Sequence, residues 1–135
     1  MIPNIDNRNV IILGKPQAGK STLAKKVKTN KHFLINTDHF GNNYGYEDAL
    51  YKLIEFINSN VSKYNNFIIE GTLGYRLLRK LFLLRIKIDL IINIESNKNI
   101  TARQQSLHNG NINMYNLFIE GDHKDIEIIN ITNEV

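Results

Sequence analysis

The segment Gly14-Lys15-Pro16-Gln17-Ala18-Gly19-Lys20-Ser21 combines two glycines, a lysine and a hydroxyl side chain at fixed spacing. It matches the pattern G-x-x-x-x-G-K-[ST], in which backbone N–H groups surround phosphate oxygens. The glycines allow backbone angles and close approaches that a Cβ would forbid. A helix that begins directly after the loop would add the positive end of its dipole. The segment therefore predicts a site for the phosphates of a nucleoside triphosphate.

Two side chains of this motif have distinct expected roles. Lys20 is placed to reach the β- and γ-phosphates, and the Ser21 hydroxyl is placed to bind Mg²⁺. The alternative interpretation of the same residues is a glycine-rich turn that carries a surface lysine. We expect nucleotide contacts from Gly14, Lys15, Pro16, Gln17, Ala18, Gly19, Lys20, Ser21 and Thr22.

A phosphate-binding loop needs a strand before it and a helix after it, and the sequence predicts both. Residues 10–13 form a continuous apolar run, which is typical of a strand buried on both faces. From Ser21 onward, Leu23, Ala24 and Val27 share one face of a predicted helix. Short β-branched runs and helical stretches then alternate, which indicates βαβ units and a parallel sheet.

The remaining elements follow from the same patterns. Further strands are expected at residues 33–36, 67–69, 89–94 and 126–131. Helices are expected at residues 46–61, 73–84 and 98–107, with a short helical turn at 114–119 and a loop at 37–45. The length of 135 residues predicts one domain over residues 1–135.

Composition and charge restrict the class of protein. The chain has no cysteine, which excludes disulfides, thiolate metal sites and a cysteine nucleophile. It has no apolar run long enough to span a bilayer, so we expect a cytoplasmic protein that does not associate with membranes. The net charge of +4 and the pI of about 9.3 suit an anionic ligand. Nucleic acid is a less favoured partner, because the basic residues are spread along the chain.

With its phosphate-loop motif and its order of elements, the sequence resembles the P-loop kinases of small molecules. This superfamily includes nucleoside, nucleotide, shikimate and polynucleotide 5′-hydroxyl kinases, and the resemblance covers nearly the whole chain. It implies an α/β fold of the P-loop NTPase type, a three-layer sandwich with a five-stranded parallel sheet in the order 2-3-1-4-5. It also implies ATP and Mg²⁺ as the cofactors.

The resemblance extends to two carboxylates. Asp38 follows the second expected strand, where several families of the superfamily place an Asp that faces the acceptor hydroxyl. A carboxylate there can take the proton of the attacking oxygen and orient it. Glu70 ends the third expected strand, where nucleoside kinases place an acidic residue that helps to hold the metal. The alternative interpretations are a turn residue for Asp38 and an exposed charge for Glu70.

Three arginines are candidates for contacts with phosphate or acceptor. In the superfamily, the segment after the fourth strand forms a lid that brings arginines over the phosphates. Residues 94–110 occupy that place here, and Arg103 is the one arginine among them. Arg103 is therefore a third predicted catalytic residue beside Lys20 and Asp38. Arg76 and Arg79 are candidate substrate-binding residues, with solvated helix charges as the alternative interpretation.

Taken together, these features predict an enzyme, an ATP-dependent kinase that moves the γ-phosphoryl group to a small acceptor. A nucleoside or nucleotide is the expected acceptor. A polynucleotide 5′-hydroxyl kinase is one alternative, favoured by the basic pI. A nucleotide-binding switch or partner protein with little transferase activity is another, favoured by the short lid and by the absence of a helix after residues 126–131. That same absence leads us to expect a homo-oligomer in which a partner subunit covers these residues.

Overall fold

A computed structural model describes residues 4–39, 46–60, 66–121 and 126–133 of the chain. Strands and helices alternate throughout, and none of the described helices has the length and apolarity needed to cross a bilayer. The elements are β1 (Val10–Gly14), α1 (Lys20–Val27), β2 (His32–Asn36), α3 (Tyr46–Asn60), β3 (Asn66–Glu70), α4 (Gly74–Leu83), β4 (Leu90–Ser96), α5 (Ala102–Glu120) and β5 (Glu127–Asn133).

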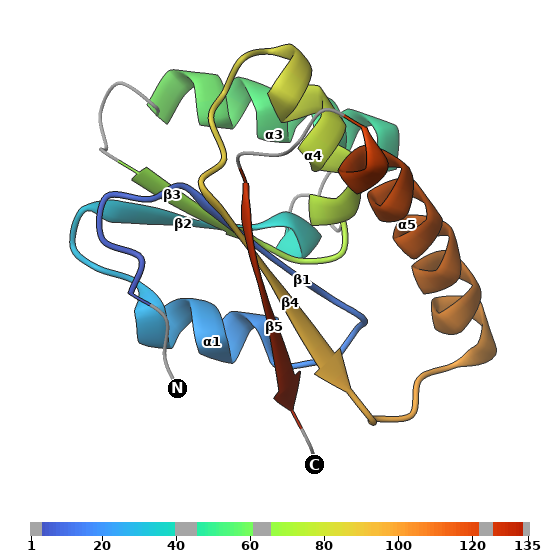
Figure 1. The fold of residues 1–135 in the computed structure, drawn as a ribbon. Helices are drawn as coiled ribbons and strands as arrows, with labels where there is room; N and C mark the ends of the chain where they lie inside the picture. The colour runs from blue at the N-terminus through green and yellow to red at the C-terminus, as the bar shows by residue number, and fades with distance from the viewer. Residues whose placement is uncertain (1–3, 40–45, 61–65, 122–125, 134–135) are drawn as a thin grey trace.

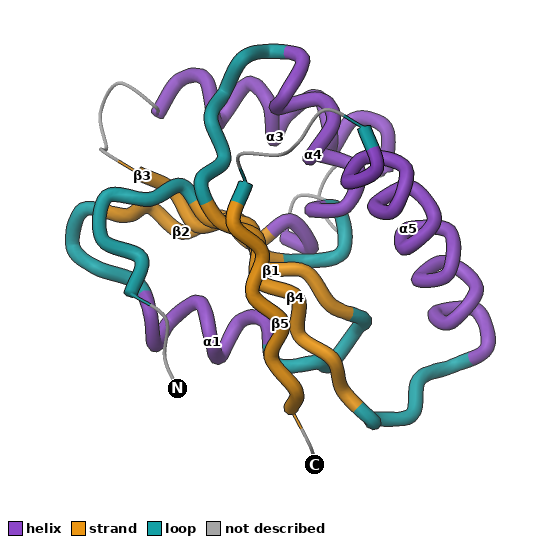
Figure 2. The backbone as a smooth tube through the Cα atoms, in the orientation of Figure 1, coloured by secondary structure: helices purple, strands orange, loops and turns teal. Residues whose placement is uncertain are grey.

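The five strands form one sheet in the order β2-β3-β1-β4-β5, and every pair is parallel (Figure 2). This confirms the expected α/β class and the expected strand order. β1 lies in the middle, where Ile12 is paired with Glu70 of β3 on one side and Ile92 of β4 on the other. All five residues of β1 are buried, because helices cover both faces of a parallel sheet.

The helices divide between the two faces of the sheet. α1 covers one face, and α3, α4 and α5 cover the other (Figure 1). Because successive side chains of a strand point to opposite faces, β1 contributes to both cores. Ile11 and Leu13 pack in the core under α3, α4 and α5, whereas Val10 and Ile12 pack in the core over α1.

The structure corrects the expected helices near the C-terminus. Residues 98–107 and 114–119 were expected to form two separate segments, but α5 is one continuous helix of 19 residues. It begins later than expected because Thr101 caps it: the Thr101 hydroxyl accepts a hydrogen bond from the N–H of Gln104, and Oε1 of Gln104 accepts one from the N–H of Thr101. The low helix propensity of residues 109–113 is overridden by packing, since Asn111 and Phe118 are buried.

Two smaller corrections concern the ends of β2 and β4. Residues 37–39 are helical rather than part of a loop, and Asn36 supports them by accepting from the N–H of Asp38 at 2.9 Å. The rest of the expected loop, residues 40–45, and residue 61 of the expected helix lie outside the described residues. β4 continues two residues beyond its predicted end, to Ser96, because it stays paired with β5.

A tight contact joins the ends of β2 and β3. Gly71, directly after β3, has a φ of +123°, and a Cβ there would overlap the Oγ1 of Thr37. Thr37 is fully buried, and its Oγ1 accepts a hydrogen bond from the N–H of Leu73 at 3.2 Å. Gly71 therefore lets the chain pass close to Thr37 before α4 begins.

We predict that Gly71→Ala destabilises the protein by about 2–4 kcal/mol, because it adds both backbone strain and a steric overlap. Gly110→Ala is the matched control, since Gly110 is an exposed helical residue and a Cβ there would meet nothing within 4 Å. The control should stabilise the protein by about 0.5–1 kcal/mol. Urea unfolding of both variants measures the difference, and equal stability of the two would contradict the role of Gly71.

Candidate functional site

The loop of residues 14–21 connects β1 to α1 and is shaped by three unusual backbone positions. Gln17 and Gly19 have φ values of 66° and 98°, in the left-handed region. At Gly14, a Cβ would lie 2.9 Å from the carbonyl oxygen of Ile94, so only glycine allows β1 and β4 to approach this closely. Gly19 caps α1 without a side chain, which leaves the first-turn N–H groups of that helix to an anion.

Lys20 is the first residue of α1, and its side chain is only 6% exposed. Its Nζ donates to the carbonyl oxygen of Gly14 at 2.6 Å and to that of Lys15 at 3.3 Å. Burial lowers the pKa of Lys20, and the carboxylates of Asp38 and Glu70 oppose that shift. The ammonium group is thus held by the carbonyls of its own loop and faces two acidic side chains.

Ser21 and Glu70 are joined by a hydrogen bond in which the Oγ of Ser21 donates to Oε1 of Glu70 at 2.9 Å. Glu70 ends β3 and is 3% exposed. Burial raises the pKa of Glu70, while the Ser21 hydrogen bond lowers it and the charge of Asp38 raises it further. A hydroxyl and a carboxylate placed side by side form an oxygen donor set of the kind that Mg²⁺ accepts.

Asp38 approaches the same place from the helical residues after β2. Its Oδ1 accepts a hydrogen bond from the N–H of Thr72 at 3.2 Å, and its side chain is exposed. Its charge acts on both Lys20 and Glu70. The structure therefore brings together Lys20, Ser21, Asp38 and Glu70 at the ends of three adjacent strands.

The three candidate arginines lie on α4 and α5. Arg103 is exposed in the first turn of α5, directly after residues 97–101, which join β4 to α5. Arg76 is half-buried in the first turn of α4. Arg79 is exposed and lines a groove that Gly121, at the far end of α5, also lines. The groove that holds Arg79 is separate from the 14–21 loop.

Thr22, the last of the predicted nucleotide contacts, is exposed in the first turn of α1. Lys15 is half-buried in the loop, whereas Ala18 is fully buried against β1 and α1. The Ala18 N–H donates to the carbonyl oxygen of Lys15 at 3.2 Å, which closes a turn within the loop. Gln17, Ser21 and Thr22 are the exposed residues of this stretch.

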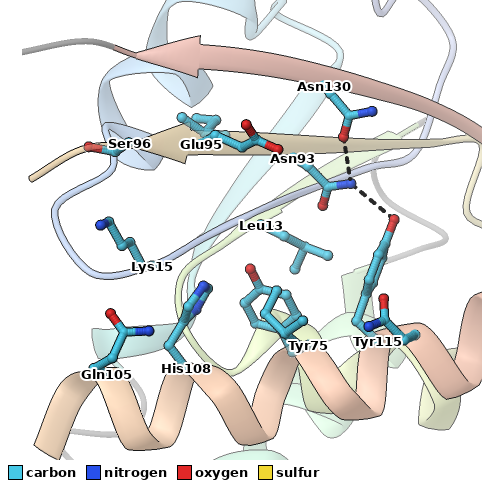
Figure 3. A pocket seen from close by; sticks show the side chains of 13 residues that line it. Leu13, Lys15, Tyr75, Asn93, Glu95, Ser96, Gln105, His108, Tyr115 and Asn130 are labelled. Atoms are coloured by element: carbon cyan, nitrogen blue, oxygen red, sulfur yellow. Dashed lines mark hydrogen bonds between the residues drawn. The ribbon is translucent and has the colours of Figure 1, made fainter. Parts of the chain in front are cut away.

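A cavity of about 400 Å³ beside the 14–21 loop contains residues that the sequence analysis missed (Figure 3). In it, Nδ2 of Asn93 donates to the hydroxyl of Tyr115 at 3.0 Å and to Oδ1 of Asn130 at 3.2 Å. Asn93 and Asn130 are direct register partners on β4 and β5. Each is the fourth residue of its strand and interrupts a run of isoleucines. This shared position was the signal in the sequence that the two asparagines could be neighbours.

Comparison with known proteins does not assign the chain to a family. No protein-family model matches the sequence, and no curated protein matches it. The residues of the site and their contacts are therefore the basis on which a function is inferred.

We predict that Glu70→Gln stabilises the unliganded protein at about pH 8, by roughly 1 kcal/mol or about 2–5 °C in melting temperature. The folded state raises the pKa of Glu70 above its ordinary value of 4.5, so it binds a proton more tightly than the unfolded state does. Above pH 4.5 the buried carboxylate therefore costs stability, and this cost grows until the pH passes the folded pKa. Glutamine removes the cost and can still accept from Ser21.

The gain should shrink as the pH falls and vanish below about 4.5, where Glu70 becomes protonated in both states. Glu120→Gln, at the exposed end of α5, is the matched control and should change little at either pH. Melting curves across this pH range measure both variants. Loss of stability in Glu70→Gln at pH 8 would show that the interactions of the Glu70 carboxylate outweigh the cost of burying it.

Proposed function

We propose that the protein has the P-loop NTPase fold and is a cytoplasmic ATP-dependent kinase that phosphorylates a small acceptor, a nucleoside or nucleotide. The observation that carries the proposal is the arrangement around Lys20. A buried ammonium group lies at the head of a helix, beside the Ser21–Glu70 pair and opposite Asp38. A glycine-framed loop with a charge, a hydroxyl and two carboxylates at its mouth suits the handling of a phosphate chain.

The residues fit a bound magnesium ion. Mg²⁺ commonly takes one or two protein oxygens together with phosphate oxygens and water. The Ser21 hydroxyl and the Glu70 carboxylate would supply those protein oxygens, directly or through water. When bound, the ion would neutralise part of the charge on the β- and γ-phosphates.

The chain's own residues would then divide the work of phosphoryl transfer. N–H groups of the 14–21 loop and the Lys20 ammonium would hold the phosphates and stabilise the charge on the transferring group. Asp38 would orient the acceptor hydroxyl and take its proton as the oxygen attacks the γ-phosphorus. The bond between the γ-phosphorus and the bridging oxygen breaks as the new bond forms, and ADP leaves.

A second candidate is a nucleotide-binding switch or partner protein with little transferase activity. The observation that favours it is that Arg103, the one arginine of residues 94–110, is exposed in the first turn of α5. Measuring ATP consumption with and without a panel of nucleosides, nucleotides and 5′-hydroxyl oligonucleotides separates the candidates. Turnover that no acceptor stimulates would favour the switch.

We predict that Lys20→Ala and Asp38→Asn have different consequences. Lys20→Ala should abolish most of the thermal stabilisation by Mg-ATP, because it removes the charge that meets the phosphates. Asp38→Asn should leave that stabilisation within about twofold in affinity and lower turnover by about 100-fold or more, as expected of a general base. Thermal shift and acceptor-stimulated ADP release are the two measurements.

Lys26→Ala is the matched control for loss of a lysine on α1, since Lys26 is exposed on the same helix. It should change neither measurement. If Asp38→Asn retains full turnover, Asp38 is not the general base, and if Lys20→Ala keeps full stabilisation by Mg-ATP, the 14–21 loop is not the phosphate site.

A further inference from the structure

The cavity beside the 14–21 loop lies between α5 and the sheet. Lys15 stands at its rim, while Asn93 of β4 and Asn130 of β5 form its floor (Figure 3). His108 and Tyr115 reach into it from α5. Its volume of about 400 Å³ falls within the range of small-molecule sites, about 300–1,000 Å³.

Tyr75 carries a buried polar group into this cavity. The residue lies in the first turn of α4 and is only 4% exposed, and its hydroxyl points towards the sheet (Figure 3). Its ring packs edge-on against His108 and Tyr115, with centroid separations of 5.9 and 6.2 Å. Among the residues that the structure describes, none hydrogen-bonds the Tyr75 hydroxyl. Buried hydroxyls normally have a partner, so this one points to a ligand.

Lys15 and the exposed Glu95 are the charged residues of the lining, whereas Asn93 is neutral and held in place. Nδ2 of Asn93 donates its two hydrogen bonds to Tyr115 and Asn130. Its carboxamide oxygen therefore remains as an acceptor within the cavity. Burial lowers the pKa of His108, and the charges of Lys20 and Lys15 lower it further, so its imidazole is neutral at pH 7. The neutral groups around Tyr75 and Asn93 thus suit an uncharged part of a ligand that donates and accepts hydrogen bonds.

The strand order relates this cavity to the phosphate site. Glu70 and Asp38 follow β3 and β2, on one side of β1, whereas the floor of the cavity belongs to β4 and β5, on the other side. Lys15 belongs to both, as a residue of the 14–21 loop and of the cavity rim. A ligand with phosphates on the loop could thus extend its uncharged end past Lys15 into the cavity.

We propose that this cavity binds the uncharged heterocyclic base of a nucleotide or nucleoside. The Tyr75 hydroxyl and the Asn93 carboxamide oxygen hydrogen-bond the edge of the ring, and the aromatic rings of Tyr75 and Tyr115 contact its faces or rim. The proposal rests on the proposed function, because it makes the base one end of the molecule whose phosphates reach the 14–21 loop. The base belongs either to the phosphate donor or to the acceptor.

The test compares ligands with and without a base. Calorimetry in the presence of Mg²⁺ measures the affinity of the whole chain for ATP, GTP, CTP, UTP and inorganic tripolyphosphate, and for the four nucleosides at saturating tripolyphosphate. The variant is Tyr75→Phe, which removes only the hydroxyl. Tyr51→Phe is the matched control, because Tyr51 is 81% exposed on α3.

We expect at least one nucleoside triphosphate to bind at least about tenfold more tightly than tripolyphosphate, or one nucleoside to bind at least about tenfold more tightly than the other three. Tyr75→Phe should weaken that ligand by about 3- to 10-fold, the effect of one neutral hydrogen bond, and leave tripolyphosphate unchanged. It should leave the melting temperature of the unliganded protein unchanged or raise it, because an unpaired buried hydroxyl is removed. If Tyr75 were merely structural, Tyr75→Phe would not weaken the base-containing ligand while leaving tripolyphosphate binding unchanged.

The outcomes also identify the source of the base. Discrimination among triphosphates assigns the cavity to the donor, and nucleoside binding beside tripolyphosphate assigns it to the acceptor. Equal affinities for tripolyphosphate and all triphosphates, with no nucleoside bound, would overturn the inference and leave the proposed function standing. Nucleoside binding that Tyr75→Phe weakens, without binding of any triphosphate, would support the cavity and overturn the proposed function. Absence of all binding would overturn both.

Discussion

The site depends on a lysine ammonium group placed where little water reaches it. Burying a charge is costly unless hydrogen bonds and opposite charges compensate, and Lys20 has both. The carbonyl oxygens of Gly14 and Lys15 hold it, and the carboxylates of Asp38 and Glu70 face it. The close approach of Gly14 to β4 and of Gly71 to Thr37 fixes the strand ends that carry these groups. The surrounding fold thus keeps two carboxylates and one ammonium in a single small space.

Much of this arrangement could be predicted from the sequence because its signals are local. The apolar run before Gly14 and the glycine spacing up to Ser21 predicted a strand, a loop and a helix, and the structure has all three. Asp38 and Glu70 each follow an apolar run, and parallel strands end at the same edge of a sheet. The pattern therefore placed them at the same edge as Lys20, and the family resemblance placed them near it. The strand order came from the family resemblance, since no pattern in the chain determines which strands are neighbours.

What could not be predicted depends on contacts between distant segments. Residues 109–113 have weak helix propensity, so nothing local indicated that α5 runs unbroken through them, and only the burial of Asn111 and Phe118 explains it. The cavity is similar, because Tyr75, Asn93 and Tyr115 come from three different elements. Each looked like an ordinary core or surface residue until the sheet and α5 were placed together.

One consequence concerns α5 itself. Its 19 residues make a rod about 28 Å long. Its residues from Gln105 to Asn116 line the cavity beside Lys15, while Phe118, near its end, packs edge-on against Phe82 of α4 at a centroid separation of 6.2 Å. A tilt of this helix as one piece would also change the contact of Phe118 with α4. The contact between Phe82 and Phe118 is thus coupled to the position of α5 beside the 14–21 loop.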